Sequence, residues 1–167
     1  MHNWVEHLKN NDYLKVQELL KNAQNANAIN DAGESVLMFA IRSHCDFALI
    51  MLLVENAADV FAVDFEGVSV FDMAVTYGNI AMVNYMLERG IDANKTERKS
   101  GFTPLMCASC YGRSEVVKIL LSKGADKNAQ DAKGLSATDF ARKMNKKSIL
   151  KLLDYDENAP KNTAYAR

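Results

Sequence analysis

The sequence contains few of the residues on which catalysis and metal binding depend. Its 167 residues include three histidines, three cysteines and two prolines. The histidines, His2, His7 and His44, are scattered and form no pair at the spacing that holds a metal, so we expect surface or capping roles for them. No nucleophile with a nearby base, phosphate-binding loop or metal-ligand spacing is recognisable. We therefore predict that the chain is not an enzyme and has no catalytic residue, no metal and no cofactor.

The sequence also lacks a long hydrophobic run. No stretch of about 20 apolar residues is present, and the N-terminus MHNWVEHLKNND has neither the basic start nor the apolar core of a signal peptide. We expect a cytoplasmic protein with no membrane contact, in which the odd number of cysteines stays reduced. The formal net charge of −1 argues against a general nucleic-acid binder.

What the sequence does contain is an internal repeat. Four glycines, Gly33, Gly67, Gly101 and Gly134, recur at a nearly constant interval, and an alanine follows each of them at the same spacing: Ala40, Ala74, Ala108 and Ala141. The segments align as GESVLMFA, GVSVFDMA, GFTPLMCA and GLSATDFA. Self-similarity at about 33 residues is typical of stacked helical repeats, whose usual function is binding.

The third copy is the clearest and runs GFTPLMCASCYGRSEVVKILLSKGADKNAQD. It resembles the ankyrin repeat, whose pattern D-x-x-G-x-T-P-L-H-x-A continues into G-x-x-x-x-V-x-x-L-L-x-x-G-A-D-x-N. The resemblance implies an all-α fold, an ankyrin-repeat solenoid of about five stacked helix-turn-helix units with β-turn or hairpin loops.

The repeat accounts for nearly all of these 167 residues, so we expect no separate catalytic domain among them. We predict one ankyrin-repeat domain over residues 1–154. It consists of an N-terminal capping unit (1–30), three full repeats (31–63, 64–97 and 98–130) and a C-terminal capping unit (131–154). Residues 155–167 are polar, and we expect a flexible tail or a short helical extension there.

The recurring residues predict where the helices begin and end. Pro104 suits the first position of a helix because its missing N–H would be unpaired there in any case. Gly78 and Gly112 are expected to end their helices in a left-handed conformation. The hydroxyl residues two positions after the repeating glycines are predicted to be N-caps: Ser35, Ser69, Thr103 and Ser136.

Two single-residue insertions interrupt the repeat period. We place one near Ser43 to Asp46, between the two helices of the second unit, and the other in the loop between Lys95 and Ser100. Insertions at turns leave the apolar stripes of the helices in register, and they could also shape a binding surface.

Some side chains with possible chemistry have a structural explanation. Cys107 and Cys110 form a C-x-x-C inside one predicted helix, but no second cysteine pair or neighbouring histidine completes a zinc site. We expect Cys107 to pack and Cys110 to face the binding groove, with redox sensitivity as the alternative. Asp72 and Asp139 stand where the family usually has histidine, and a carboxylate near a helix N-terminus explains them without catalysis.

Charge divides the chain into two halves. Residues 1–94 contain 5 Lys/Arg against 13 Asp/Glu, net −8, whereas residues 95–151 contain 13 against 5, net +8. Because sequence order follows position along a repeat stack, we expect a rod with an acidic N-terminal half and a basic C-terminal half.

In ankyrin proteins the turn tips and the exposed side of the first helices line a concave groove. Transferred by alignment, the resemblance implies these partner-binding residues: Phe65, Glu66, Val68, Tyr77, Lys99, Phe102, Cys110, Tyr111, Lys133 and Lys143. The apolar members from two adjacent units, which are Phe65, Val68, Tyr77, Phe102 and Tyr111, are predicted to form a solvent-facing cluster typical of an interface. The alternative is that Val68 and Phe102 pack across neighbouring turns.

We therefore predict a non-catalytic protein-protein interaction module that binds an unidentified protein partner as a monomer. Two alternatives stay open. One is regulation or protection of an enzyme or a redox system through the thiols, by analogy with small bacterial ankyrin proteins of this size that support antioxidant enzymes. The other is salt-dependent, head-to-tail self-association of the dipolar rod.

Overall fold

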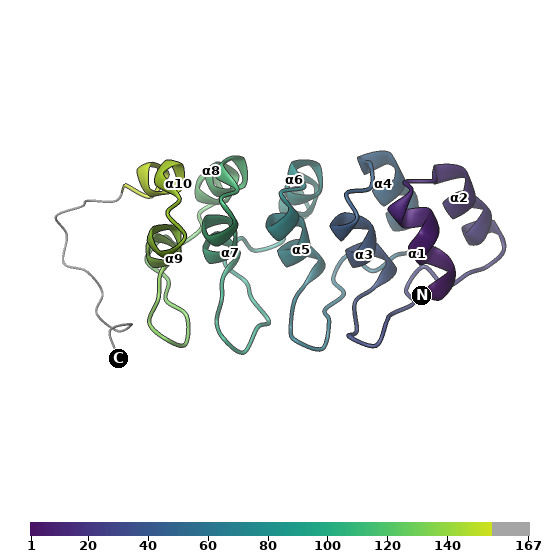
Figure 1. The fold of residues 1–167 in the computed structure, drawn as a ribbon, viewed down its shortest axis with the longest axis horizontal. Coiled ribbons are helices and arrows are strands. Elements are labelled where there is room, and N and C mark those ends of the chain that lie inside the picture. The colour runs from purple at the N-terminus through teal and green to yellow at the C-terminus, as the bar shows by residue number, and fades with distance from the viewer. Residues whose placement is uncertain (155–167) are drawn as a thin grey trace.

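The computed structural model describes residues 1–154, which form ten helices stacked in two layers (Figure 1). In chain order the helices are α1 (His2–Lys9), α2 (Tyr13–Lys21), α3 (Val36–Arg42), α4 (Phe47–Glu55), α5 (Val70–Tyr77), α6 (Ile80–Glu88), α7 (Pro104–Tyr111), α8 (Ser114–Ser122), α9 (Ala137–Lys143) and α10 (Lys147–Leu152). Each odd-numbered helix pairs with the even-numbered helix that follows it, and the odd-numbered helices lie side by side along the stack. The predicted all-α solenoid is confirmed.

Long loops join one helix pair to the next and project to the same side of the stack (Figure 1). Two of these loops contain an isolated antiparallel β-bridge, Ile29 with Ser35 and Val63 with Ser69. One helix pair falls within each of the five predicted units, whose bounds and capping roles stay predictions. The predicted tail, residues 155–167, lies outside the described residues.

The predicted helix ends are confirmed. The hydroxyl oxygens of Ser35, Ser69, Thr103 and Ser136 each accept a hydrogen bond from the backbone N–H three residues later. Pro104 is the first residue of α7. Gly78 and Gly112 follow α5 and α7 with φ of +68° and +72°, in the left-handed region.

Both insertions are also present in the structure. Counted from the repeating glycine of its unit, α4 begins one position later than α6, α8 and α10 do. The extra residue therefore lies in the turn between α3 and α4. The second insertion makes the interval from Gly90 to Gly101 one position longer than the equivalent interval from Gly124 to Gly134.

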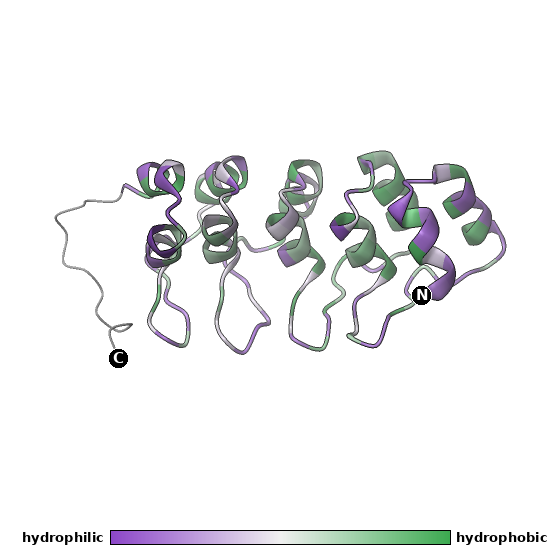
Figure 2. Ribbon diagram, viewed as in Figure 1, coloured by the Kyte–Doolittle hydropathy of each residue, from purple (hydrophilic) through white to green (hydrophobic). Residues whose placement is uncertain are grey.

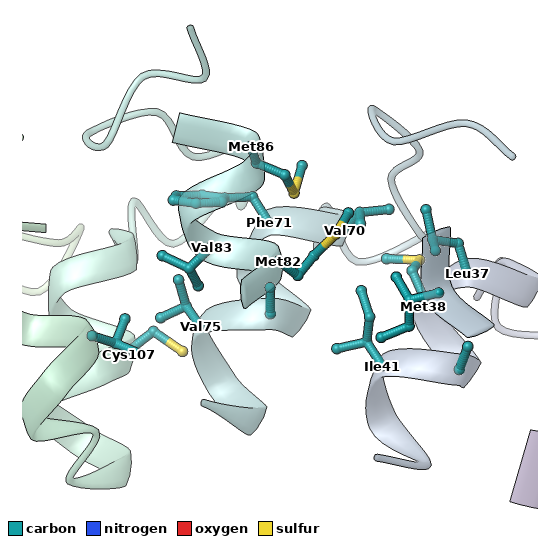
Figure 3. Packing of buried hydrophobic residues seen from close by; sticks show 14 of the residues in the cluster. Leu37, Met38, Ile41, Val70, Phe71, Val75, Met82, Val83, Met86 and Cys107 are labelled. Atoms are coloured by element: carbon teal, nitrogen blue, oxygen red, sulfur yellow. The ribbon is translucent and has the colours of Figure 1, made fainter. Parts of the chain in front are cut away.

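One apolar core runs along the stack between the helices. Hydrophobic residues concentrate in the helices, most of all in α4 (Figure 2), and side chains from α3, α5 and α6 meet in the interior (Figure 3). Helices of this length are not stable alone in water, so burial between neighbouring units holds them in place. None of the helices within residues 1–154 has the length and apolar character that spanning a membrane requires.

Candidate functional site

Three of the four projecting turns are closed in the same way. In one of them, the Asp64 carboxylate accepts hydrogen bonds from the N–H groups of Glu66 and Val68, both at 2.9 Å. Asn30 in the preceding turn and Asp131 in the last turn accept equivalent bonds. Such side-chain bonds replace the flexibility of a loop with a defined turn, so the residues at its tip have fixed positions.

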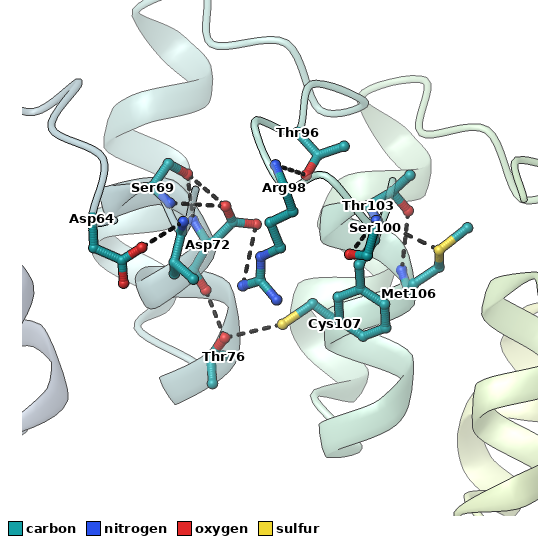
Figure 4. A network of polar contacts seen from close by, with 12 residues as sticks. Asp64, Ser69, Asp72, Thr76, Thr96, Arg98, Ser100, Thr103, Met106 and Cys107 are labelled. Carbon is teal, nitrogen blue, oxygen red and sulfur yellow. Dashed lines mark hydrogen bonds and ion pairs between the residues drawn. The ribbon is translucent and has the colours of Figure 1, made fainter. Parts of the chain in front are cut away.

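The remaining turn, in the fourth unit, differs because Arg98 stands where the others have Asn or Asp. Its N–H donates to the Thr96 hydroxyl at 3.2 Å, and the Ser100 hydroxyl accepts from the N–H of Phe102 at 3.4 Å. The Arg98 guanidinium points into the stack, where its Nη2 lies 3.7 Å from Oδ1 of Asp72 (Figure 4). A charged pair therefore joins the third and fourth units.

The Asp72 carboxyl is almost completely shielded from water, with 1% of the side chain exposed. Its Oδ2 accepts hydrogen bonds from the N–H and hydroxyl of Ser69 at 3.0 and 2.8 Å, which anchors it at the start of α5. Burial raises the pKa of Asp72 above its ordinary value, although the Ser69 hydrogen bonds and the charge of Arg98 oppose the rise.

The contact with Arg98 is electrostatic, because Oδ1 of Asp72 and Nε of Arg98 have no hydrogen-bond partner among the described residues. Arg98 was not among the residues predicted from the sequence. The available signal was a basic residue at the turn position where Asp64 and Asp131 stand.

Four of the predicted partner-binding residues come together at the turn tips of the third and fourth units. Phe65, Glu66, Val68 and Lys99 line a groove with a volume of about 700 Å³ between these two turns. Phe65 lies against the backbone of Gly33 in the preceding turn and is 74% exposed. Glu66 and Lys99 are exposed, and Val68 is half-buried. The groove thus presents an aromatic ring between charges of both signs.

The predicted solvent-facing cluster of five apolar residues is divided in the structure. Phe65 and Tyr111 are 74% and 53% exposed, but Val68, Tyr77 and Phe102 are half-buried against the core. The solvent-facing prediction is therefore wrong for those three side chains, because the neighbouring units cover them.

Ring contacts show what covers two of them. Tyr77 packs edge-on against His44, with 5.6 Å between ring centroids, and Phe102 packs edge-on against Phe140 at 4.9 Å. Phe102 thus packs against helix α9 of the next unit, and not across neighbouring turns as in the alternative. No ring contact joins two of the five predicted members within residues 1–154.

The other predicted residues lie further along the same side of the stack. Cys110 and Lys143 hold equivalent positions near the ends of α7 and α9, with Cys110 half-buried and Lys143 exposed. Lys133 is exposed at the tip of the last turn, where its N–H is bonded to Asp131. The structure does not bring these three residues into the groove lined by Phe65, and their role in binding stays a prediction.

Two of the three thiols are inaccessible. Cys107 is fully buried and lies 3.0 Å from the Thr76 hydroxyl, and burial raises its pKa to about 11 (Figure 4). The Cys45 thiol donates to the Leu8 carbonyl at 3.0 Å, and burial also raises its pKa to about 11. Because the thiolate is the reactive form, neither group is set up for redox chemistry at neutral pH. Cys110 alone is partly exposed.

Alkylation distinguishes these thiols. We expect iodoacetamide at pH 8 to modify Cys110 in the folded protein, while Cys45 and Cys107 react at least tenfold more slowly, because they are buried and protonated. Mass spectrometry of tryptic peptides measures each site, and denaturant should expose all three. A Cys110→Ser variant serves as the control and should remain unmodified while folded. Equal labelling of Cys107 would contradict its packed assignment.

Comparison with known proteins places these features in a family. A model of three consecutive ankyrin repeats matches residues 5–97, and a model of the single ankyrin repeat matches residues 100–132. One relative is the E3 ubiquitin-protein ligase hecd-1 of Caenorhabditis elegans, 38% identical over 106 residues, which are 64% of this chain and 4% of the relative. The E3 ubiquitin-protein ligase Ufd4 of Drosophila melanogaster is 34% identical over 116 residues, 70% of this chain and 4% of the relative.

A third relative matches more of the chain at lower identity. The tyrosine-protein kinase HTK16 of Hydra vulgaris is 27% identical over 153 residues, which are 89% of this chain and 20% of the relative. The chain thus spans a small part of each of these relatives. All three organisms are eukaryotes, so they give no support to the expected likeness to small bacterial ankyrin proteins.

Proposed function

This chain belongs to the ankyrin-repeat family, and from that we propose that it binds one protein partner at its turn tips and along the groove side of its first helices. Ankyrin repeats are generally protein-protein interaction modules and are typically non-catalytic. In the enzymes among the relatives, the repeats are not the catalytic part. The proposed binding surface is centred on the turns of the third and fourth units.

The observation that supports this proposal is the exposure of Phe65. An aromatic side chain that is 74% exposed and held on a fixed turn loses little conformational freedom on binding, and its burial by a partner removes apolar surface from water. Tyr111, at the end of α7, offers a second aromatic side chain with 53% exposure. Aromatic anchors surrounded by charge are common in protein interfaces.

The distribution of charge along the stack favours one orientation of the bound partner. Glu66 belongs to the acidic half of the chain, and Lys99, Lys133 and Lys143 belong to the basic half. Glu34, which follows Gly33 in the preceding turn, adds little negative charge to this surface. It is buried, and its carboxylate accepts two hydrogen bonds from Arg42 at 2.7 and 2.9 Å. We therefore propose a partner whose surface is basic where it meets Glu66 and acidic where it meets the lysines.

The experiment that tests this proposal replaces both exposed aromatics. We expect Phe65→Ser combined with Tyr111→Ser to reduce partner capture from source-cell extract at least tenfold, as quantified by mass spectrometry of the captured proteins. The far-UV circular dichroism should stay unchanged, because both side chains are exposed.

The matched control for this experiment is Leu14→Ser on α2. Leu14 has the same 74% exposure as Phe65 but lies outside the proposed surface, so this variant should capture the partner normally. Light scattering at low and high salt separates partner capture from self-association. Undiminished capture by the double variant would rule out this surface.

A further inference from the structure

Polar links between projecting loops hold the stack together at its two ends. Asn27 donates to the Ala57 carbonyl at 2.8 Å and accepts from the Asp59 N–H at 2.7 Å, which joins two consecutive loops. Asn94 makes the same pair of bonds to the last loop, at 3.1 and 2.7 Å. Each asparagine therefore satisfies one carbonyl and one N–H of its neighbour.

The middle pair of loops lacks this link because Phe61 stands in the place of the asparagine. The loop over residues 57–67 and the loop over residues 90–101 are therefore not bridged by a side chain at this position. Phe61 is 65% exposed, and Val63, two residues further along, is 40% exposed. Phe61 is thus an exposed apolar side chain where the other loops have asparagine, whereas Val63 has an apolar equivalent, Ile29, in the first loop.

A second link is missing at the turn tips. The N–H of Phe65 donates to the Ala32 carbonyl at 3.2 Å, and the N–H of Ala132 donates to the Ser100 carbonyl at 2.8 Å. Within residues 1–154, no equivalent backbone bond joins Glu66 and Lys99. The loop of Lys99 also carries the one-residue insertion between Lys95 and Ser100.

A pocket of about 80 Å³ opens between these two loops on the α6 side. Its apolar walls include Phe61, Val63, Phe71, Met86 and Ile91. It adjoins the groove at the turn tips, and both are lined by Val63 and Glu97. The lining is that of a site for an aliphatic side chain.

The loop beside this pocket carries acidic side chains that have no ion-pair partner among the described residues. Asp59, Asp64 and Glu66 alternate with the apolar residues of the segment, and no cation forms an ion pair with any of the three within the described residues. By contrast, Lys95 on the opposite loop is paired with its own neighbour Glu97 at 2.9 Å. Asp59 and Asp64 accept backbone N–H bonds from their own loop, but no cation neutralises the three carboxylates, and such charges next to exposed apolar groups complement a basic segment.

The pocket and the acidic loop beside it are called the cleft below. We propose that this cleft binds a peptide segment of the protein partner in which an aliphatic side chain enters the pocket between Phe61 and Ile91. A lysine or arginine side chain next to it faces Asp64 and Glu66. The inference rests on the proposed function, since it supposes a protein partner, but it also assigns binding to Phe61 and Ile91, which do not line the groove.

The test uses a synthetic peptide as the probe. An acetylated octapeptide with a central leucine between lysines is titrated into the ¹⁵N-labelled chain, and we expect saturable shifts at the amides of Phe61, Val63 and Glu97. A peptide with serine in place of leucine and a peptide with glutamate in place of the lysines should each bind at least tenfold more weakly. Absence of shifts at these amides with the leucine-lysine peptide would overturn the proposal.

The informative variant is Phe61→Asn. We expect it to weaken binding of the leucine-lysine peptide at least tenfold and to raise Tm by a few degrees, because asparagine can restore the bridge that Asn27 and Asn94 make elsewhere. A higher Tm means that weaker binding does not result from unfolding. Leu14→Asn is the control and should leave binding unchanged. Equal binding by wild type and Phe61→Asn would overturn the proposal.

Two further outcomes separate this inference from the proposed function. Partner capture that depends on Phe65 and Tyr111 but not on Phe61 would overturn the proposal that the cleft binds the partner and would support the proposal that the groove does. Peptide binding that Phe61→Asn abolishes, with capture indifferent to Phe65 and Tyr111, would support the cleft and rule out the groove. Shifts of the same amides on raising protein concentration alone would identify a second copy as the occupant and overturn the peptide proposal.

Discussion

Replacing Gly67 with alanine is expected to lower the free energy of unfolding by about 3 kcal/mol, from backbone strain and overpacking together. Gly67 has φ of +81°, which costs an L-residue about 1–2 kcal/mol. A Cβ added there would also lie 2.5 Å from the carbonyl oxygen of Glu97 and 3.1 Å from Cα of Arg98. Because both contacts are with backbone, the adjacent loop itself would have to move. Urea unfolding followed by circular dichroism measures the loss.

Gly90→Ala is the matched control for this substitution. Gly90 has a nearly equal φ of +86°, but a Cβ added there would meet nothing within 4 Å. We expect a loss of about 1 kcal/mol, from backbone strain alone. Equal losses for Gly67→Ala and Gly90→Ala would contradict the close approach of the third and fourth turns.

Arg98→Met is expected to lower the free energy of unfolding at pH 7 by about 3 kcal/mol, the usual effect of removing one partner of a buried ion pair. The variant leaves the Asp72 carboxylate shielded from water with no cation beside it. Lys99→Met is the control, because Lys99 is adjacent but exposed, and its loss should stay within about 0.5 kcal/mol.

The pH dependence of this loss follows from Asp72. Since burial raises the folded-state pKa of Asp72 above its ordinary value, its contribution to stability is fully present below the unfolded pKa and is lost as pH rises through the folded pKa. Removing the charge of Arg98 raises the folded-state pKa of Asp72 further, so the Asp72 carboxyl of the variant is protonated at pH 4. The decrease in the free energy of unfolding caused by Arg98→Met should therefore be smaller at pH 4 than at pH 7. Equal losses at both pH values would show that Arg98 acts through packing over the Phe102 ring instead.

The sequence predicted the repeating parts of the fold because each depends on local chemistry. A hydroxyl at a helix start, a proline at Pro104 and a glycine at Gly78 have their effect within a few residues, so pattern alone located them. The two insertions were found for the same reason, since they change only the spacing between recurring residues.

The sequence predicted the candidate site less well because exposure depends on neighbouring units. Phe65 and Phe102 both belong to turns of the repeat, but only Phe102 has an aromatic partner, Phe140 on helix α9 of the next unit. Alignment to a family gives the position of a side chain, not what covers it. Phe61 was missed because it replaces an asparagine whose hydrogen bonds join consecutive loops in space, and Arg98 was missed because its contact with Asp72 of the preceding unit is formed only in the folded stack.

The third and fourth units lack the two loop-to-loop links that join the other units, so we expect the molecule to open there as two units, although the Arg98–Asp72 pair still crosses this interface. In a repeat array, the interface between each pair of neighbouring units contributes separately to the free energy of unfolding. Where one interface is weak, the units on one side of it can unfold while those on the other side stay folded. Amide hydrogens in α5 and α7 should therefore exchange by different opening events, although the two helices are in contact. A peptide lodged between Phe61 and Ile91 would join the halves, slow exchange on both sides of the interface and convert the array into one cooperative unit.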